Sequence, residues 1–104
     1  MTAERRQLHQ YPVIVVVWAM PGCGHCEEYT PRFRAIAAEQ DCIPSAVINC
    51  EDVDPRWLEH YEIVPVPCTM VLRYGRVTAR RDQPVPDQAI RHLFGLAAFG
   101  NPCD

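Results

Sequence analysis

Apolar residues along this chain fall into short runs that suit buried strands. Residues 13–17 form an unbroken run of valine and isoleucine, which is typical of a central strand buried on both faces. Residues 45–50 predict a second strand, parallel to the first. Residues 68–74 and 76–81 predict two more strands, joined around Gly75 as a hairpin.

A helical repeat of apolar positions follows the first strand, over residues 27–40. Its apolar face consists of residues three or four positions apart, together with one neighbour: Tyr29, Phe33, Ile36 and Ala37. We expect this helix to begin near Cys23, after a turn at residues 19–22. Pro31 lies inside it and is expected to kink it, because the proline ring removes a backbone donor and crowds the preceding turn.

Two further helices have recognisable starts. Asp54 is a typical N-cap, and Pro55 suits the first helical position of a short helix. Pro86 starts the last helix, which Gly100 ends. The buried stripe of this last helix is predicted to contain Ala89, Ile90, Leu93, Phe94 and Ala97.

The order of these elements is strand, helix, strand, helix, strand, strand, helix. This order predicts an α/β domain with a mixed central sheet and helices on both faces. The 104 residues are enough for a single domain with one core. Residues 1–10 and 100–104 are expected to be peripheral tails, and the polar residues 2–10 allow a short helix.

Charge and hydropathy narrow the function classes. The formal net charge of −3 argues against a nucleic-acid binder, because such proteins usually present a basic face. No apolar run approaches the length that spans a bilayer, so no membrane partner is expected. The first residues lack the apolar core of a signal peptide, and we therefore expect a cytoplasmic protein. All ten basic residues are arginine, which excludes a lysine Schiff base.

The segment Cys23-Gly24-His25-Cys26 is the motif with the clearest chemistry. Two thiols three positions apart, between a strand and a helix, favour a redox dithiol over a metal site. At a helix N-terminus, Cys23 gains from free backbone N–H groups and the positive end of the helix dipole, which favour its reactive thiolate. Histidine titrates near neutrality, and an imidazolium at His25 is expected to favour the thiolate further.

Three separated features accompany this motif. Trp18-Ala19 precedes it, and Pro31 falls five positions after its second cysteine. Residues 63–67 (Ile-Val-Pro-Val-Pro) lead into an apolar strand that ends near Gly75. Together with the dithiol, this set resembles the thioredoxin family over nearly the whole chain, about residues 11–99. The resemblance implies a thioredoxin fold and thiol–disulfide oxidoreductase activity.

The resemblance also implies roles for individual residues. The Gly24-His25 centre is similar to that of protein disulfide isomerase domains. Pro67 corresponds to a cis-proline that faces the dithiol, and the residue before it offers backbone groups to an extended substrate. The residues alone also allow Pro67 to be an edge-strand proline without a role. The residues expected on the substrate side are Trp18, Val66, Pro67 and Cys68.

The mechanism implied by this resemblance has two thiol–disulfide exchange steps. Cys23 attacks a disulfide of a protein substrate, and the more buried Cys26 then releases the reduced substrate. The reverse direction forms or isomerises disulfides. No cofactor motif accompanies the dithiol, so a separate reductase or glutathione is the expected electron source, and a monomer is the expected state.

Three departures from the family pattern qualify this picture. The family places a buried acid at about Val16, where this chain has none, so deprotonation of Cys26 is expected to rely on water or His25. Met20-Pro21-Gly22 replaces the tryptophan that directly precedes the first cysteine in the family. Cys68 follows Pro67, and the sequence leaves it open as a resolving thiol, a metal ligand or a small buried hydrophobe.

Two other functions stay open at this point. Cys23, Cys26 and Cys68 are candidate ligands for zinc or an iron–sulfur cluster, with a fourth ligand from a second subunit. Alternatively, the fold serves as an interaction module without turnover, because the buried acid is missing.

The remaining cysteines and charges are expected to have structural roles. Cys42 and Cys50 flank the second strand and are predicted to be structural thiols, although a disulfide between them is open. Cys103 is expected to be an exposed thiol in the tail. Asp82 shows no partner pattern, and Glu28 and Arg32 are expected to lie on a solvated helix face with modest (i, i+4) support.

Overall fold

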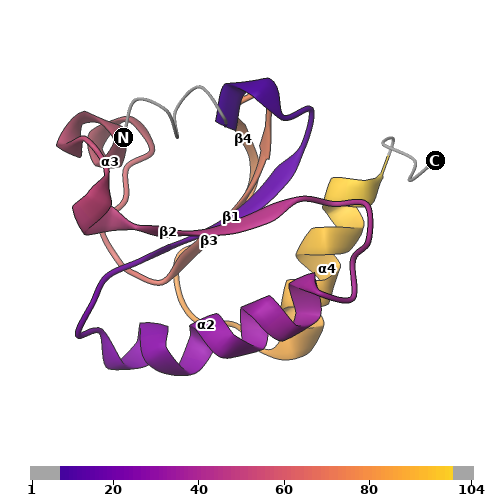
Figure 1. Cartoon of the computed structure of the whole chain (residues 1–104), viewed down its shortest axis with the longest axis horizontal. Helices are drawn as coiled ribbons and strands as arrows, with labels where there is room; N and C mark the ends of the chain where they lie inside the picture. Colours follow the sequence, from indigo (N-terminus) through magenta and orange to yellow (C-terminus); the bar gives the residue numbers. More distant parts are fainter. Residues whose placement is uncertain (1–7, 100–104) are drawn as a thin grey trace.

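The computed structural model describes residues 8–99 and contains a four-stranded mixed sheet (Figure 1). The strand order is β2-β1-β3-β4, in which β1 is parallel to β2 and antiparallel to β3, and β3 is antiparallel to β4. The four strands are β1 (Ile14–Ala19), β2 (Ser45–Asn49), β3 (Cys68–Arg73) and β4 (Arg76–Arg81). All four predicted strands are therefore confirmed, and each end lies within two residues of its predicted position.

Helices cover both faces of this sheet, as the sequence predicted. Figure 1 shows α2 (Gly24–Ala37) and α4 (Asp87–Ala98) together below the sheet and α3 (Pro55–His60) above it. The face below is called the α2–α4 face here, and the face above is called the α3 face. None of the helices within residues 8–99 has the length and apolar character needed to cross a membrane.

Strand β1 is buried on both faces because its side chains alternate between two apolar clusters. Val15 and Val17 pack with Phe33 on the α2–α4 face, while Val16 and Trp18 pack on the α3 face. All six residues of the strand are buried. The unbroken β-branched run thus fills both cores, because successive side chains of a strand point to opposite faces.

The predicted helix starts are also confirmed by local hydrogen bonds. The Asp54 carboxylate accepts from the Arg56 backbone N–H at 2.9 Å, and Pro55 is the first residue of α3. Helix α2 ends at Ala37, earlier than predicted, because the backbone N–H groups of Glu39 and Gln40 bond to carbonyls three residues back.

The last helix follows its prediction where the structure describes it. Residues Ile90, Leu93, Phe94 and Ala97 are buried, whereas Ala89 is only half-buried. The predicted stop at Gly100 lies outside the described residues. A short 3-10 turn at Cys50–Asp52 was not predicted, and it forms because the Asn49 side chain accepts from the Glu51 backbone N–H at 2.9 Å.

Candidate active site

Cys23 lies at the junction between β1 and α2. The turn before it contains Gly22 at φ +77°, a left-handed conformation that favours glycine. Cys23 is the N-cap of α2, and its Sγ accepts from the Cys26 backbone N–H at 3.1 Å. The Cys23 sulfur therefore lies at the N-terminus of α2, where the first backbone N–H groups of the helix have no carbonyl partner within the helix. Gly24 follows, and a side chain there would meet no atom within 4 Å.

The second cysteine of the motif has a different environment. Cys26 is 3% exposed, whereas Cys23 is half-buried. Burial, together with the interaction with the Cys23 sulfur, raises the pKa of the Cys26 thiol to about 11. One thiol is therefore accessible at a helix N-terminus, while the other is protected and protonated at neutral pH.

The loop before β3 brings the predicted proline to the dithiol. The Val66–Pro67 peptide bond is cis, and Pro67 is buried. The Cys23 thiol points at the Val66 carbonyl, with 3.9 Å between Sγ and the oxygen. Cys23 thus meets Val66 and Pro67, which lie more than 40 residues further along the chain, at one end of the sheet.

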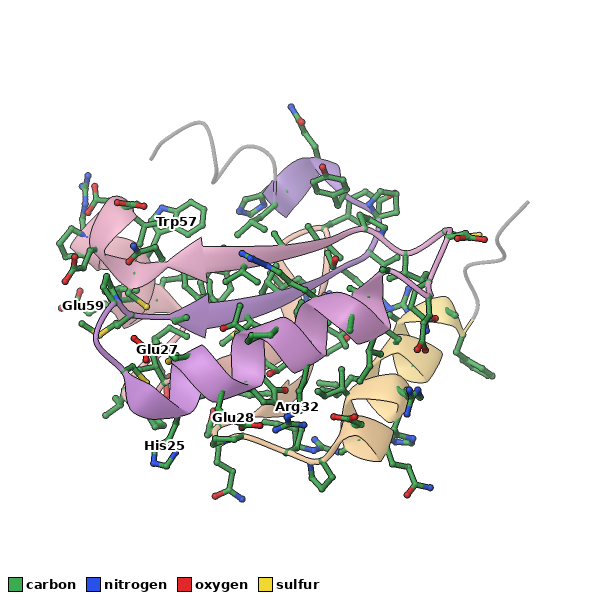
Figure 2. All side chains as sticks on the ribbon, turned by 60° about the horizontal axis from the view of Figure 1, so that its bottom comes forward. His25, Glu27, Glu28, Arg32, Trp57 and Glu59 are labelled. Carbon is green, nitrogen blue, oxygen red and sulfur yellow. The ribbon has the colours of Figure 1, made fainter. Side chains whose placement is uncertain are left out.

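His25 is exposed and does not contact the thiols. Its ring projects from the first turn of α2 away from the sheet (Figure 2). Within residues 8–99 no hydrogen bond joins the imidazole to either cysteine. The prediction that His25 directly stabilises the Cys23 thiolate therefore finds no hydrogen bond in this conformation.

Trp18 does not face a substrate, contrary to the sequence prediction. It is 0% exposed and packs on the α3 face against Trp57 and Tyr61, with ring centroids 6.2 Å and 5.5 Å away. The reason is strand alternation, since Trp18 shares its face with Val16 and pairs with Cys68 in β3. Trp18 is therefore a core residue next to the site, and its Nε1 has no hydrogen-bond partner among the described residues.

Cys68 is also 0% exposed, which overturns its predicted contact with substrate. Its thiol donates to Asp82 Oδ1 at 3.3 Å, so Asp82 has a partner that the sequence did not reveal. Burial and this bond raise the pKa of Cys68 to about 12. A buried thiol with so high a pKa is a poor nucleophile, so Cys68 does not fit a resolving thiol.

No buried acid lies beneath the dithiol in the part of the chain that the structure describes. Val16 is 0% exposed, and no charged side chain is buried among residues 8–99. The Thr69 hydroxyl pairs with the Tyr29 hydroxyl at 2.8 Å, a link between α2 and β3 that the sequence analysis missed. The helical spacing of apolar residues predicted that Tyr29 is buried. It could not predict the hydrogen bond, because the partner of the hydroxyl lies on a strand that is distant in the sequence.

A cavity of about 480 Å³ opens beside Cys26, between the start of α2 and the end of β2. It is lined by the turn at Met20 and Pro21, and its polar lining includes Glu27, Thr30 and Asn49. Glu27 is the only carboxylate of the lining and stands on the first turn of α2 (Figure 2). The cavity is large enough to admit water to the neighbourhood of Cys26.

The other predicted thiols separate into two groups. Cys50 is a buried free thiol, and burial raises its pKa. Cys42 forms a disulfide, so its predicted state as a free structural thiol is wrong, and because Cys50 is free the two are not joined to each other. The prediction for Cys103 lies outside the described residues.

A metal centre has no geometric support in the part of the chain that the structure describes. No group of three or more histidine, cysteine, aspartate or glutamate side chains there could hold a metal ion. Cys68 is bonded to Asp82 instead of converging with Cys23 and Cys26 on a common point. The zinc or iron–sulfur alternative therefore loses the third ligand on which it depended.

Comparisons with known proteins identify the fold. No family model and no curated protein sequence matches the chain. Among solved structures, oxidised thioredoxin from Plasmodium falciparum matches with a TM-score of 0.80 at 16% identity, covering 94% of this chain and 93% of that one. Thioredoxin from Fasciola hepatica matches with a TM-score of 0.75 at 17% identity, covering 92% and 90%. Thioredoxin f2 from Chlamydomonas reinhardtii gives 0.73 at 18% identity, covering 94% and 89%.

The protein is thus an α/β domain with a thioredoxin fold and a dithiol at one end of its sheet. The predicted fold class is confirmed. At such low sequence identity, the similarity to these structures is evidence for the fold alone. The function of the site has to be argued from its own geometry.

Proposed function

We propose that the protein is a thiol–disulfide oxidoreductase that uses Cys23 and Cys26 to reduce protein disulfides or, in the reverse direction, to form or isomerise them. One observation carries this proposal: an accessible thiol at a helix N-cap lies beside a buried second thiol. The Cys23 sulfur accepts from the Cys26 backbone N–H at 3.1 Å, and the Val66 carbonyl lies 3.9 Å away. The thioredoxins with the same fold support it at the level of the class.

The reaction follows from the different environments of the two thiols. The Cys23 thiolate attacks one sulfur of the substrate disulfide, which forms a mixed disulfide and expels the other substrate sulfur as a thiolate that takes up a proton. Cys26 then loses its proton to water in the adjoining cavity and attacks the Cys23 sulfur. The second substrate thiolate leaves, and two electrons have passed from the dithiol to the substrate, leaving a Cys23–Cys26 disulfide.

The surface around Cys23 suits an extended protein segment. Met20 is 41% exposed and Val64 is 87% exposed, and both stand in segments that border the dithiol. Pro21 and Pro65 are exposed beside them and add apolar surface. The substrate is accordingly a protein disulfide, and a separate reductase or glutathione restores the dithiol of this monomeric domain.

The test is reduction of insulin disulfides in the presence of dithiothreitol. Cys23→Ser is expected to abolish the activity, and Cys26→Ser is expected to accumulate a mixed disulfide on Cys23 that mass spectrometry detects. Cys50→Ser is the matched control, because this free thiol is buried and takes no part in the proposed exchange. Full activity in Cys23→Ser would sink the assignment.

The reduction potential of the couple decides the direction. A value of about −270 mV indicates a reductase, and one of about −180 mV indicates an oxidase or isomerase. The resemblance of Gly24-His25 to isomerase domains favours the second value.

A second candidate is a thioredoxin-fold interaction protein that forms mixed disulfides without turnover. It is favoured by the absence of a buried acid within residues 8–99 and by the high pKa of Cys26, because both slow the resolving step. A wild-type mixed disulfide that persists for hours at pH 7 would favour it. Rapid multiple turnover would exclude it.

A further inference from the structure

Asp82, the hydrogen-bond partner of Cys68, belongs to a larger polar network on the α3 face. Asp82 Oδ1 accepts from the Cys68 thiol at 3.3 Å and from Arg80 Nε at 2.5 Å. Arg80 also donates to the backbone carbonyls of Tyr61 at 2.5 Å and Glu62 at 2.6 Å. A single guanidinium therefore joins the end of β4 to the end of α3.

A β-bulge places these groups opposite one another. The pairing of β3 with β4 shifts between Val71 and Leu72, so that Met70 pairs with Arg80 and Thr69 with Arg81. The next step of this register puts Asp82 opposite Cys68. Without the extra residue the register slips by one, which would put Arg81 there and turn Arg80 to the other face.

The network holds both ends of the loop that carries the cis-proline. Tyr61 and Glu62 stand at the start of this loop, and Cys68 stands directly after Pro67. Glu62 has φ +54°, so the chain leaves α3 in a left-handed conformation that needs support from its surroundings. Both ends of residues 63–67 are therefore bonded, directly or through Asp82, to the same arginine of β4.

The chemistry of the three side chains fits this arrangement. Arginine offers five donors in a planar fork, so Arg80 can serve a carboxylate and two carbonyls at once, which a lysine cannot do in the same geometry. Hydrogen bonds between ionised partners are stronger than neutral ones, and Arg80 lowers the pKa of Asp82 so that the carboxylate stays ionised. Cys68 is a small donor that closes the network inside the core.

We propose that Arg80, Asp82 and Cys68 form a clamp that positions residues 63–67, so that the Val66 carbonyl stays beside Cys23 for a protein substrate. The three side chains are positioning residues, and the Cys68 thiol takes no part in electron transfer. The proposal rests on the proposed function for its kinetic test, although the clamp itself is a property of the folded chain.

The kinetic test compares Arg80→Gln with Arg81→Gln. Arg81 is the matched control, because it stands on the same strand with the same charge and, among residues 8–99, its side chain donates only to the Arg80 carbonyl. For insulin, kcat/KM is expected to fall about tenfold in Arg80→Gln, mainly through KM, and to change less than about twofold in Arg81→Gln. Reduction of a small disulfide, 5,5′-dithiobis(2-nitrobenzoate), is expected to stay within about twofold in both variants, because it needs no backbone contact.

A second pair of variants tests the buried donor. Cys68→Ser keeps a donor for Asp82 and is expected to retain the wild-type ratio between insulin and small-disulfide rates. Cys68→Ala lacks the donor and is expected to lower that ratio several-fold. Equal ratios in both variants, or equal losses in Arg80→Gln and Arg81→Gln, would overturn the clamp. If Arg80→Gln does not fold, Cys68→Ser and Cys68→Ala still test the clamp.

Thiol labelling separates failure of the clamp from failure of the proposed function. Native protein is exposed to iodoacetamide at pH 8, and modification of Cys68 is followed by peptide mass mapping. Cys68 is 0% exposed, so labelling is expected to be slow in the wild type and in Arg81→Gln. It is expected to be more than about tenfold faster in Arg80→Gln, because the loop over it opens more often. Equal labelling in all three proteins would contradict the clamp even if no disulfide is ever reduced.

Discussion

The two faces of the sheet are built differently at the end that carries the dithiol. On the α2–α4 face, Phe33 and Ile36 of α2 pack in an apolar cluster, and the polar link buried beside it among residues 8–99 is the neutral pair of Tyr29 and Thr69. On the α3 face, the neighbouring position Cys68 is bonded to an ionised network of Asp82 and Arg80. The same two residues of β3, Cys68 and Thr69, thus face opposite kinds of surroundings.

This difference separates the chemistry from the positioning. A charge close to a titrating thiol shifts its pKa, and ionised groups beside Cys26 would alter its proton affinity and the redox balance of the dithiol. The ionised network instead bonds the far side of the loop, with the start of β3 between it and Cys26. The α3 face can therefore use strong ionic bonds to position Val66, while neither Arg80 nor Asp82 is among the groups that shift the pKa of Cys26.

The largest effect that tests this separation is the dependence of the resolving step on pH. The pKa of Cys26 is raised to about 11, mainly by burial. We expect this burial to persist in the mixed disulfide. The thiolate fraction, and with it the rate of release, is expected to rise about tenfold per pH unit from pH 7 to about 10. Rapid-quench trapping of the mixed disulfide measures this rate.

The matched control for this prediction is Cys68→Ser. Cys68 also has a raised pKa, but it lies on the other face and is bonded to Asp82. The slope with pH is expected to be unchanged in this variant. A rate that levels off near pH 8 would show that a base close to Cys26 lowers its pKa, and Glu27 in the adjoining cavity would then be the residue to replace.

The next largest effect concerns stability on the α2–α4 face. Phe33 is 1% exposed and packs against Phe94 with ring centroids 5.6 Å apart. Phe33→Ala is expected to lower the free energy of unfolding by about 3–5 kcal/mol, because it removes a buried ring and leaves a cavity. Denaturant unfolding measures this loss. At a temperature where the variant is folded, its ratio of insulin to small-disulfide rates is expected to match the wild type, in contrast to Arg80→Gln.

Most of the fold could be predicted because its signals are local. The β-branched run of β1, the Asp54 cap with Pro55, and the two thiols at a helix start each depend on a few neighbouring residues. The position of Pro67 beside Cys23 came from the resemblance to a family, since the two residues are far apart in the sequence.

The parts that could not be predicted depend on register. Whether Trp18 faces the substrate or the core depends on a one-residue alternation in β1. The hydrogen-bond partner of Cys68 depends on a bulge between Val71 and Leu72, and no turn residue in the sequence predicts this bulge. His25 was expected beside the thiols from its place in the motif, but the direction of its side chain on the first turn of α2 decides the contact (Figure 2).

A smaller effect is expected from the neutral pair on the α2–α4 face. Tyr29→Phe leaves the Thr69 hydroxyl buried without a partner and is expected to lower stability by about 1–2 kcal/mol. Thr69→Val orphans the Tyr29 hydroxyl and is expected to have a similar effect. The double variant is expected to lose less than the sum of the two, and a double-mutant cycle by urea unfolding measures the coupling. Strictly additive losses would contradict a direct bond between the hydroxyls.

The smallest effect concerns an ion pair at the solvent edge of the same face. Arg32 was expected to be a solvated helix residue, and its predicted (i, i+4) partner Glu28 is confirmed at 2.8 Å (Figure 2). Arg32 also bonds Asp87 at 2.6 Å and the Val85 carbonyl at 3.1 Å, so it joins α2 to the start of α4.

Arg32→Gln is expected to lower the free energy of unfolding by less than about 1 kcal/mol, because ion pairs near the surface contribute little. Arg34→Gln is the matched control on the same helix, since no ion pair of Arg34 is found among the described residues, and it is expected to have no effect. The difference between the two variants is expected to shrink in about 1 M salt, where screening weakens exposed pairs. A difference that persists in salt would mean that the bond to the Val85 carbonyl, rather than the charges, joins the two helices.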